Sequence, residues 1–178
     1  VGAAATGLRP IAELMFCGFL TVGMDQLVNQ AAKMRYMFGG KISMPMVVRL
    51  PAGAGTGAAA QHSQSLEAWL THVPGLKVVY PSCAQDALGL MLAAIDDEDP
   101  VMYFEQKTLF GVKGEVTSLE PIPLGKGRVA RPGSDLSIIT YGKQVYDALE
   151  AADKLAGEGV DVEVIDLRSL YPLDKELI

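Results

Sequence analysis

The chain has 178 residues, 49% of them apolar but only 7% aromatic, and a formal net charge of -6. This length can bury a hydrophobic core and suits one domain, or one domain with part of another. The acidic balance excludes a basic nucleic-acid surface, and no apolar run reaches the roughly 18 residues of a membrane span, so we expect neither nucleic acid nor membrane as a partner.

The first part of the chain alternates strand-like and helix-like segments. We predict a strand at 9–15, a helix at 19–37 with apolar residues at helical spacing, and a nearly all-apolar strand at 44–50. An all-apolar strand is covered on both faces, which is typical of a parallel sheet. A Gly/Ala-rich loop at 51–60 then follows the strand.

The alternation continues beyond this loop. The next predicted elements are a helix at 66–70, a strand at 76–80, a helix at 84–95 and a strand at 101–105. Ser82 and Gln85 have the spacing of a capping box, in which both side chains cap the first turn of a helix. Strands and helices in this order predict an α/β fold with a doubly wound, mostly parallel sheet.

Residues 106–125 interrupt this order, because they contain several Gly and Pro residues and few apolar positions. The elements predicted after them are a strand at 136–141, a helix at 143–156 and a strand at 160–167. We therefore predict one domain at 1–122 and the start of a second at 123–178. Val1–Gly7 resembles the second half of a helix, and Asp174 resembles the N-cap of a helix that is cut off, so we expect the chain to be an internal piece of a longer protein.

The loop sequence Gly53-Ala54-Gly55-Thr56-Gly57-Ala58 matches the G-x-G-x-x-A pattern of a dinucleotide-binding turn. Such a site also needs an acidic residue at the end of the next strand, where it holds the ribose hydroxyls. That strand ends in Val78–Ser82, which contains no carboxylate. A flexible or close-packed connecting loop is the better interpretation.

Two side chains follow strands at the carboxyl edge of the predicted sheet, where ligands bind in open α/β folds. Phe19 has the flat ring needed to stack on a ligand, although burial in the core is its alternative role. His62 follows the Gly/Ala loop, and local hydrogen bonding is its alternative role. The thiols of Cys17 and Cys83 lie among apolar neighbours and are expected to be buried in a reducing compartment, so we expect a cytoplasmic location.

Asp96–Asp99 is an acidic run at the end of the helix predicted at 84–95. Carboxylates oppose the helix dipole there, and a solvated turn is the plain interpretation. The alternative is a cation bound by the last helical carbonyls, which lack intrahelical partners. A cage of metal-binding side chains is not indicated, because no paired Cys or His spacing occurs.

Several longer segments, all in the same order, resemble the β subunit of the E1 component of pyruvate, branched-chain 2-oxo acid and acetoin dehydrogenases. These segments are Gly7–Glu13, Asp25–Lys33, His62–Trp69, Pro74–Val79, Pro81–Ser82, Asp99–Val101 and Ile165–Arg168. The resemblance implies a transketolase-like fold, with a pyrimidine-binding domain followed by the start of a C-terminal-like domain. It also implies the cofactor thiamine diphosphate, bound between the E1 α and β subunits of an α2β2 assembly.

The roles of individual residues follow from this resemblance alone. Phe19 is expected to stack on the aminopyrimidine ring, and His62 to assist proton transfers and acylation of the lipoyl domain of E2. A potassium ion is expected at the main-chain oxygens of Met46, Ala94, Ile95, Asp97 and Asp99. The glutamate that engages the pyrimidine is expected upstream of Val1, and the Mg²⁺ and diphosphate motif in the α subunit. By itself, the fragment is expected to be inactive.

Two positions depart from the family pattern. Gly18 stands where relatives usually carry Asp or Asn, and Asp99 stands where Asn is usual. Lys107–Val116 is closer to acetoin-type members, which favours acetoin as the substrate. Two other functions stay open: a different transketolase-superfamily enzyme, such as a deoxyxylulose-phosphate synthase, and a non-catalytic interaction module.

Overall fold

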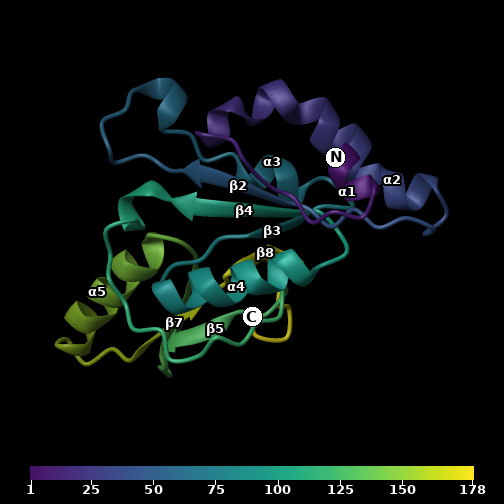
Figure 1. Cartoon of the computed structure of the whole chain (residues 1–178). Helices are drawn as coiled ribbons and strands as arrows, with labels where there is room; N and C mark the ends of the chain where they lie inside the picture. Colours follow the sequence, from purple (N-terminus) through teal and green to yellow (C-terminus); the bar gives the residue numbers. More distant parts are fainter.

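Two sheets organise the chain in the computed structural model, which describes residues 1–178 (Figure 1). The strands are β1 (Ile11–Glu13), β2 (Val47–Ala52), β3 (Lys77–Val79), β4 (Val101–Gln106), β5 (Arg128–Arg131), β6 (Leu136–Thr140), β7 (Val162–Asp166) and β8 (Ser169–Tyr171). The larger sheet has the order β1-β2-β4-β3-β8 and the smaller one the order β5-β7-β6. Only the pairs β3–β8 and β5–β7 are antiparallel. The predicted α/β fold with a mostly parallel sheet is confirmed.

Helical segments cover both faces of the larger sheet. The α-helices are α1 (Gly2–Ala5), α2 (Ala32–Met37), α3 (Glu67–Thr71), α4 (Ala84–Asp96) and α5 (Gln144–Ala156). Shorter segments are the 3-10 turns η1 (Cys17–Gly23), η3 (Ala60–His62) and η4 (Lys107–Leu109), and the π-helix η2 (Gln26–Ala31). In Figure 1 the segments before β2 lie above the sheet, α4 lies below it, and α5 lies beside the smaller sheet. None of these helices has the length and apolar character needed to cross a bilayer.

Strand β2 shows why its residues are nearly all apolar. Val48 and Leu50 pack into a core with η1, η2 and α3, whereas Val47 packs with Val101 and Leu90 on the α4 side. Successive side chains of a strand point to opposite faces, so a strand covered on both faces has no polar face. The predicted strand at 44–50 therefore forms, three residues later than expected.

The helix predicted at 19–37 is helical, but not as one α-helix. It consists of η1, η2 and α2 in succession, with Leu20, Leu27 and Ala31 buried as the apolar spacing predicts. Glycines and β-branched residues disfavour a regular α-helix, and both occur in η1. The strand predicted at 9–15 is also shorter, because β1 covers only Ile11–Glu13 at an exposed sheet edge.

The predicted capping box is wrong. The N-cap of α4 is Cys83, and no side chain caps the helix. Ser82 donates instead to the Asp166 carboxylate at 2.5 Å, and the amide of Gln85 bonds to Thr117 and Ser118. A hydrogen bond to a carboxylate is stronger than one between neutral groups, which explains why Ser82 is drawn away from the helix.

The second half of the chain contains two strands that the sequence did not predict, β5 and β8. Strand β8 crosses to the larger sheet and pairs with β3, so it joins the two halves of the chain. A turn follows Asp174 at residues 175–177, and the predicted helix beyond it stays a prediction. The Asp174 carboxylate accepts a hydrogen bond from the N–H of Gly127 at 3.2 Å. The stretch 110–127 contains no helix or strand, as expected for a connecting segment.

Candidate functional site

Three aromatic rings meet beyond the carboxyl ends of β1 and β2. The ring of His62 lies 5.0 Å from that of Phe16, at an interplanar angle of 72°, and 5.7 Å from that of Phe19, at 80°. These are edge-to-face contacts of the kind aromatic pairs favour. Phe19 remains 39% exposed, so its predicted alternative of core burial is wrong. The structure therefore brings the two predicted site residues together, and adds Phe16 to them.

Contacts with the rings of Phe16 and Phe19, and not hydrogen bonds, position the imidazole of His62. Its side chain is half-buried, and neither ring nitrogen takes part in a hydrogen bond within the chain, although the main-chain oxygen accepts one from Lys107. A structural histidine usually hydrogen-bonds to nearby backbone, and this one does not. Its two nitrogens are thus available to a ligand.

The segment that carries His62 is anchored on both sides. The carbonyl of Gln64 accepts hydrogen bonds from the N–H of Gly53 at 2.9 Å and from the thiol of Cys17 at 3.1 Å. The ammonium of Lys107, in η4, lies 4.6 Å from the centre of the Phe16 ring. The position of His62 thus depends on η1, on the loop after β2 and on η4.

The glycine-rich loop after β2 packs closely against the chain's own β4–η4 turn. Gly53 and Gly55 have φ angles of 88° and 99°, which favour glycine. A Cβ on Gly53 would collide with the amide of Gln106, and one on Gly55 would lie 3.1 Å from Thr108. Close packing was one of the two forms expected of a connecting loop, and these glycines provide it.

Gly18 lets η1 approach the segment that carries His62. A Cβ at this position would lie 2.7 Å from the carbonyl oxygen of Gln61 and 3.3 Å from the side chain of Gln64. A real Cβ does not approach a backbone oxygen so closely. The Asp or Asn expected at this position would therefore collide with the backbone of Gln61.

We expect Gly18→Asn to destabilise the protein by roughly 1–3 kcal/mol, because it overpacks this contact. Gly23→Asn is the matched control, because Gly23 ends the same 3-10 turn and nothing lies within 4 Å of its Cβ position. Urea unfolding of both variants measures the difference. Equal midpoints for the two variants would contradict the close contact at Gly18.

Cations of the chain itself lie at the acidic run that follows α4. Arg9 donates to the carbonyls of Ile95 at 2.9 Å and Asp97 at 3.0 Å, and it pairs with the carboxylate of Glu98. Lys77 pairs with the Asp97 carboxylate at 2.6 Å. Ile95 and Asp97 belong to the set predicted to bind potassium, so that ion would share two oxygens with a guanidinium.

The other predicted potassium ligands give no closed cage. The carbonyl of Met46 accepts a hydrogen bond from the N–H of Val101 at 2.9 Å, and the structure records no such bond to the carbonyls of Ala94 and Asp99. No group of three or more His, Cys, Asp and Glu side chains is arranged to hold a metal ion. The potassium site stays a prediction.

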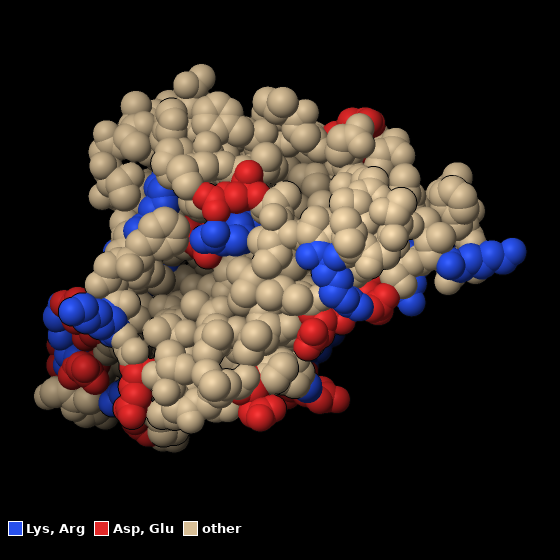
Figure 2. All heavy atoms as spheres, in the orientation of Figure 1, with Lys and Arg blue, Asp and Glu red and all other residues tan.

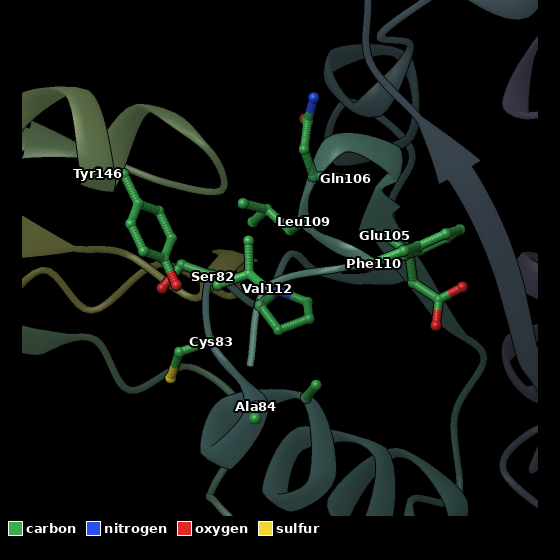
Figure 3. Close-up of a pocket in the computed structure, with 11 residues that line it drawn as sticks. Ser82, Cys83, Ala84, Glu105, Gln106, Leu109, Phe110, Val112 and Tyr146 are labelled. Atoms are coloured by element: carbon green, nitrogen blue, oxygen red, sulfur yellow. The ribbon is translucent and has the colours of Figure 1, made fainter. Parts of the chain in front are cut away.

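A cavity of about 220 Å³ lies between the two halves of the chain (Figure 3). Its lining includes Ser82 and Cys83 before α4, Leu109 of η4, and Tyr146 of α5, whose ring faces the start of α4. Burial raises the pKa of the Cys83 thiol, so it is not an activated nucleophile. Burial also raises the pKa of the Cys17 thiol. Cys17 is buried as expected, whereas Cys83 is only half-buried.

A network of buried charges connects the two halves beside this cavity. Asp86 of α4 pairs with Arg128 at 3.1 Å and with Arg168 at 3.0 Å. Arg128 also pairs with Asp166 at 3.2 Å. Burial raises the pKa of Asp166, against the opposing effects of its hydrogen bond from Ser82 and the charge of Arg128. The sequence did not predict this network.

The surface around Phe19 and His62 carries almost no charge. The segments 14–24 and 50–66 contain no Lys, Arg, Asp or Glu. Figure 2 shows the upper left of the molecule as a largely uncharged area, bordered below by acidic and basic side chains. Met15 and Val22 are among its exposed apolar side chains. Large uncharged surfaces of this kind mark interaction sites.

Comparison with family models gives two matches that together cover most of the chain. The model for the transketolase pyrimidine-binding domain matches residues 1–113, and that for the transketolase C-terminal domain matches residues 125–178. The predicted boundary after residue 122 falls in the stretch that neither model covers.

Three known proteins are similar to the chain over its whole length or nearly so. The β subunit of acetoin:2,6-dichlorophenolindophenol oxidoreductase from Cupriavidus necator is 55% identical over 100% of this chain and 53% of its own length. The β subunit of 2-oxoisovalerate dehydrogenase from Bacillus subtilis is 48% identical over 100% of this chain and 55% of its own length. A solved split-gene transketolase, described as an inactive β4 tetramer, has a TM-score of 0.80 and 27% identity to this chain. The match covers 99% of this chain and 54% of the transketolase chain. The chain spans about half the length of these relatives.

Proposed function

Because the chain belongs to the transketolase family, with matches to its pyrimidine-binding and C-terminal domains, we propose that it is part of an E1 β subunit. That enzyme would use thiamine diphosphate to cleave acetoin or a 2-oxo acid and to transfer the acyl group to a lipoyl domain. The single observation that carries the proposal is the position of the His62 imidazole. It contacts the rings of Phe16 and Phe19 at the ligand-binding edge of the sheet and forms no hydrogen bond within the chain. Identity of 55% to an acetoin-oxidising β subunit favours acetoin as the substrate.

The residues at this edge fit the flat face of the cofactor's aromatic pyrimidine ring. Phe19 offers a partly exposed ring for stacking, and the segments 14–24 and 50–66 around it contain no charged residue. Thiamine diphosphate, when bound, supplies a nucleophilic carbon for attack on a substrate carbonyl. The chain's own part is to orient the ring through Phe19, and to move a proton at the substrate oxygen through a nitrogen of His62.

The proposal includes a second chain, an E1 α subunit, which would hold the diphosphate and Mg²⁺ in an α2β2 assembly. The exposed apolar side chains of Met15, Phe19 and Val22 support such an interface. The lipoyl domain of E2 would accept the acyl group. We further propose that the enzyme works in the cytoplasm, and that potassium binds at the loop after α4.

Turnover by the full-length β subunit with its α subunit tests the proposal. We expect acetoin, pyruvate or a branched-chain 2-oxo acid to reduce an artificial electron acceptor, and only when thiamine diphosphate, Mg²⁺ and both chains are present. Activity of the β chain without an α chain would favour a deoxyxylulose-phosphate synthase type of enzyme. Absence of turnover with all three substrates would favour a non-catalytic interaction module.

A further inference from the structure

Lys107 brings a positive charge to the cluster formed by Phe16, Phe19 and His62. It follows β4 and begins η4, and its side chain is half-buried. Its ammonium donates a hydrogen bond to the main-chain oxygen of His62 and lies 4.6 Å from the centre of the Phe16 ring. Both contacts hold the charge beside the residue that is proposed to move protons.

This charge has no counter-ion within the chain. None of the ion pairs includes Lys107. Glu105, two residues earlier, is bound to Arg49 at 2.9 and 3.0 Å. A half-buried charge that lacks a partner is costly, and an anion at this place would offset the cost.

Lys107 also has hydrogen-bonding capacity to spare. An ammonium group has three N–H donors and no acceptor. One donor is used by the carbonyl of His62, and the contact with Phe16 is made to the ring face. At least one donor is therefore left for a ligand, and a charged acceptor such as a carboxylate forms the stronger bond.

The two classes of substrate differ in the group that such a donor would meet. In a 2-oxo acid the reacting carbonyl is bonded directly to a carboxylate, whereas in acetoin the same place is taken by an uncharged carbon that carries a hydroxyl group. Because the ammonium of Lys107 bonds to the main-chain oxygen of His62, its charge lies beside the residue that is proposed to act at the carbonyl oxygen.

We propose that Lys107 is a specificity-determining residue that binds the carboxylate of a 2-oxo acid. The inference rests on the proposed function, and it extends that function: the site accepts a carboxylate in addition to the neutral acetoin. In chemical terms the ligand is a small monocarboxylate with an adjacent carbonyl.

The test uses the full-length protein assembled with its partner subunit and three variants. Lys107→Gln keeps a donor for the carbonyl of His62 but removes the charge, and Lys107→Arg keeps the charge. Lys113→Met is the control, because Lys113 is exposed and forms no ion pair or side-chain hydrogen bond. The readout is the ratio of kcat/KM for pyruvate to kcat/KM for acetoin, with KM and kcat determined separately.

We expect Lys107→Gln to lower this ratio by roughly 10- to 100-fold, mainly through a higher KM for pyruvate, as for the loss of a charged hydrogen bond. Lys107→Arg should keep the ratio within a few-fold of the wild type, and Lys113→Met should not change it. An equal loss of kcat/KM for both substrates would overturn the inference, because Lys107 would then only position His62.

Wild-type turnover separates a failure of the inference from a failure of the proposed function. A wild type that accepts acetoin but no 2-oxo acid overturns the inference and leaves the function standing. One that accepts neither overturns the function, and the inference with it. If only 2-oxo acids are accepted, the methyl ester of the 2-oxo acid replaces acetoin as the neutral substrate in the ratio.

Discussion

Replacement of His62 by alanine is expected to lower kcat of the assembled enzyme by about 10²- to 10⁴-fold, the usual contribution of a positioned acid or base. Stability should change little, because the imidazole is half-buried and forms no hydrogen bond within the chain. What the substitution removes is the edge contact with Phe16 and Phe19 and the group that moves the proton. The main-chain bond from Lys107 is retained.

The control variant is His72→Ala, because His72 is the only other histidine of the chain. His72 is exposed at the C-terminal end of α3, and its substitution by alanine should leave kcat unchanged. Steady-state turnover and thermal unfolding of both variants are measured side by side. Normal turnover in His62→Ala would remove the catalytic assignment, and a large drop in its unfolding temperature would return His62 to a structural role.

The sequence predicted those elements that local pattern determines. The strands β2 and β4 and the helices α4 and α5 are long or strongly apolar, and each forms within a few residues of its predicted span. The strands β5 and β8 have only 4 and 3 residues. Such short strands exist because a neighbouring strand pairs with them, and single-sequence patterns do not contain that information.

The candidate site was predictable in part for a geometric reason. Phe19 and His62 each follow a parallel strand, and the carboxyl ends of parallel strands share one edge of the sheet. Phe16 and Lys107 were missed as site residues. Phe16 lies three residues before Phe19, a spacing that could have indicated it, whereas Lys107 meets His62 only through a contact across 45 positions.

Gly18 and Ser82 show where sequence reasoning reaches its limit. Gly18 appeared as an unexplained departure, and its cause is the backbone of Gln61 on a different segment. Ser82 had the right spacing for a helix cap but donates to Asp166, which is 84 residues away. In both cases a tertiary contact determines the role of the residue, and the local sequence pattern does not indicate that contact.

The contact made by Ser82 belongs to the charged network between the two halves of the chain, where we expect a large effect on stability. Asp86→Ala should destabilise the full-length protein by roughly 3–5 kcal/mol, as for removal of one partner from a buried ion pair. The Asp86 side chain is 3% exposed and binds both Arg128 and Arg168, of which Arg168 is 12% exposed. Its loss leaves Arg128 paired with Asp166 and leaves the Arg168 guanidinium without a carboxylate partner.

Asp147→Ala tests whether burial is the cause, because Asp147 also pairs with a cation, Lys143 at 2.6 Å, but on the surface of α5. Exposed pairs contribute little, so this control should unfold almost as the wild type does. Urea unfolding of the full-length protein, followed by circular dichroism, compares the two variants. Equal small losses would show that Asp86 adds nothing beyond a surface pair. A much larger loss for Asp86→Ala would mean that the two halves of the chain depend on this network for their stability.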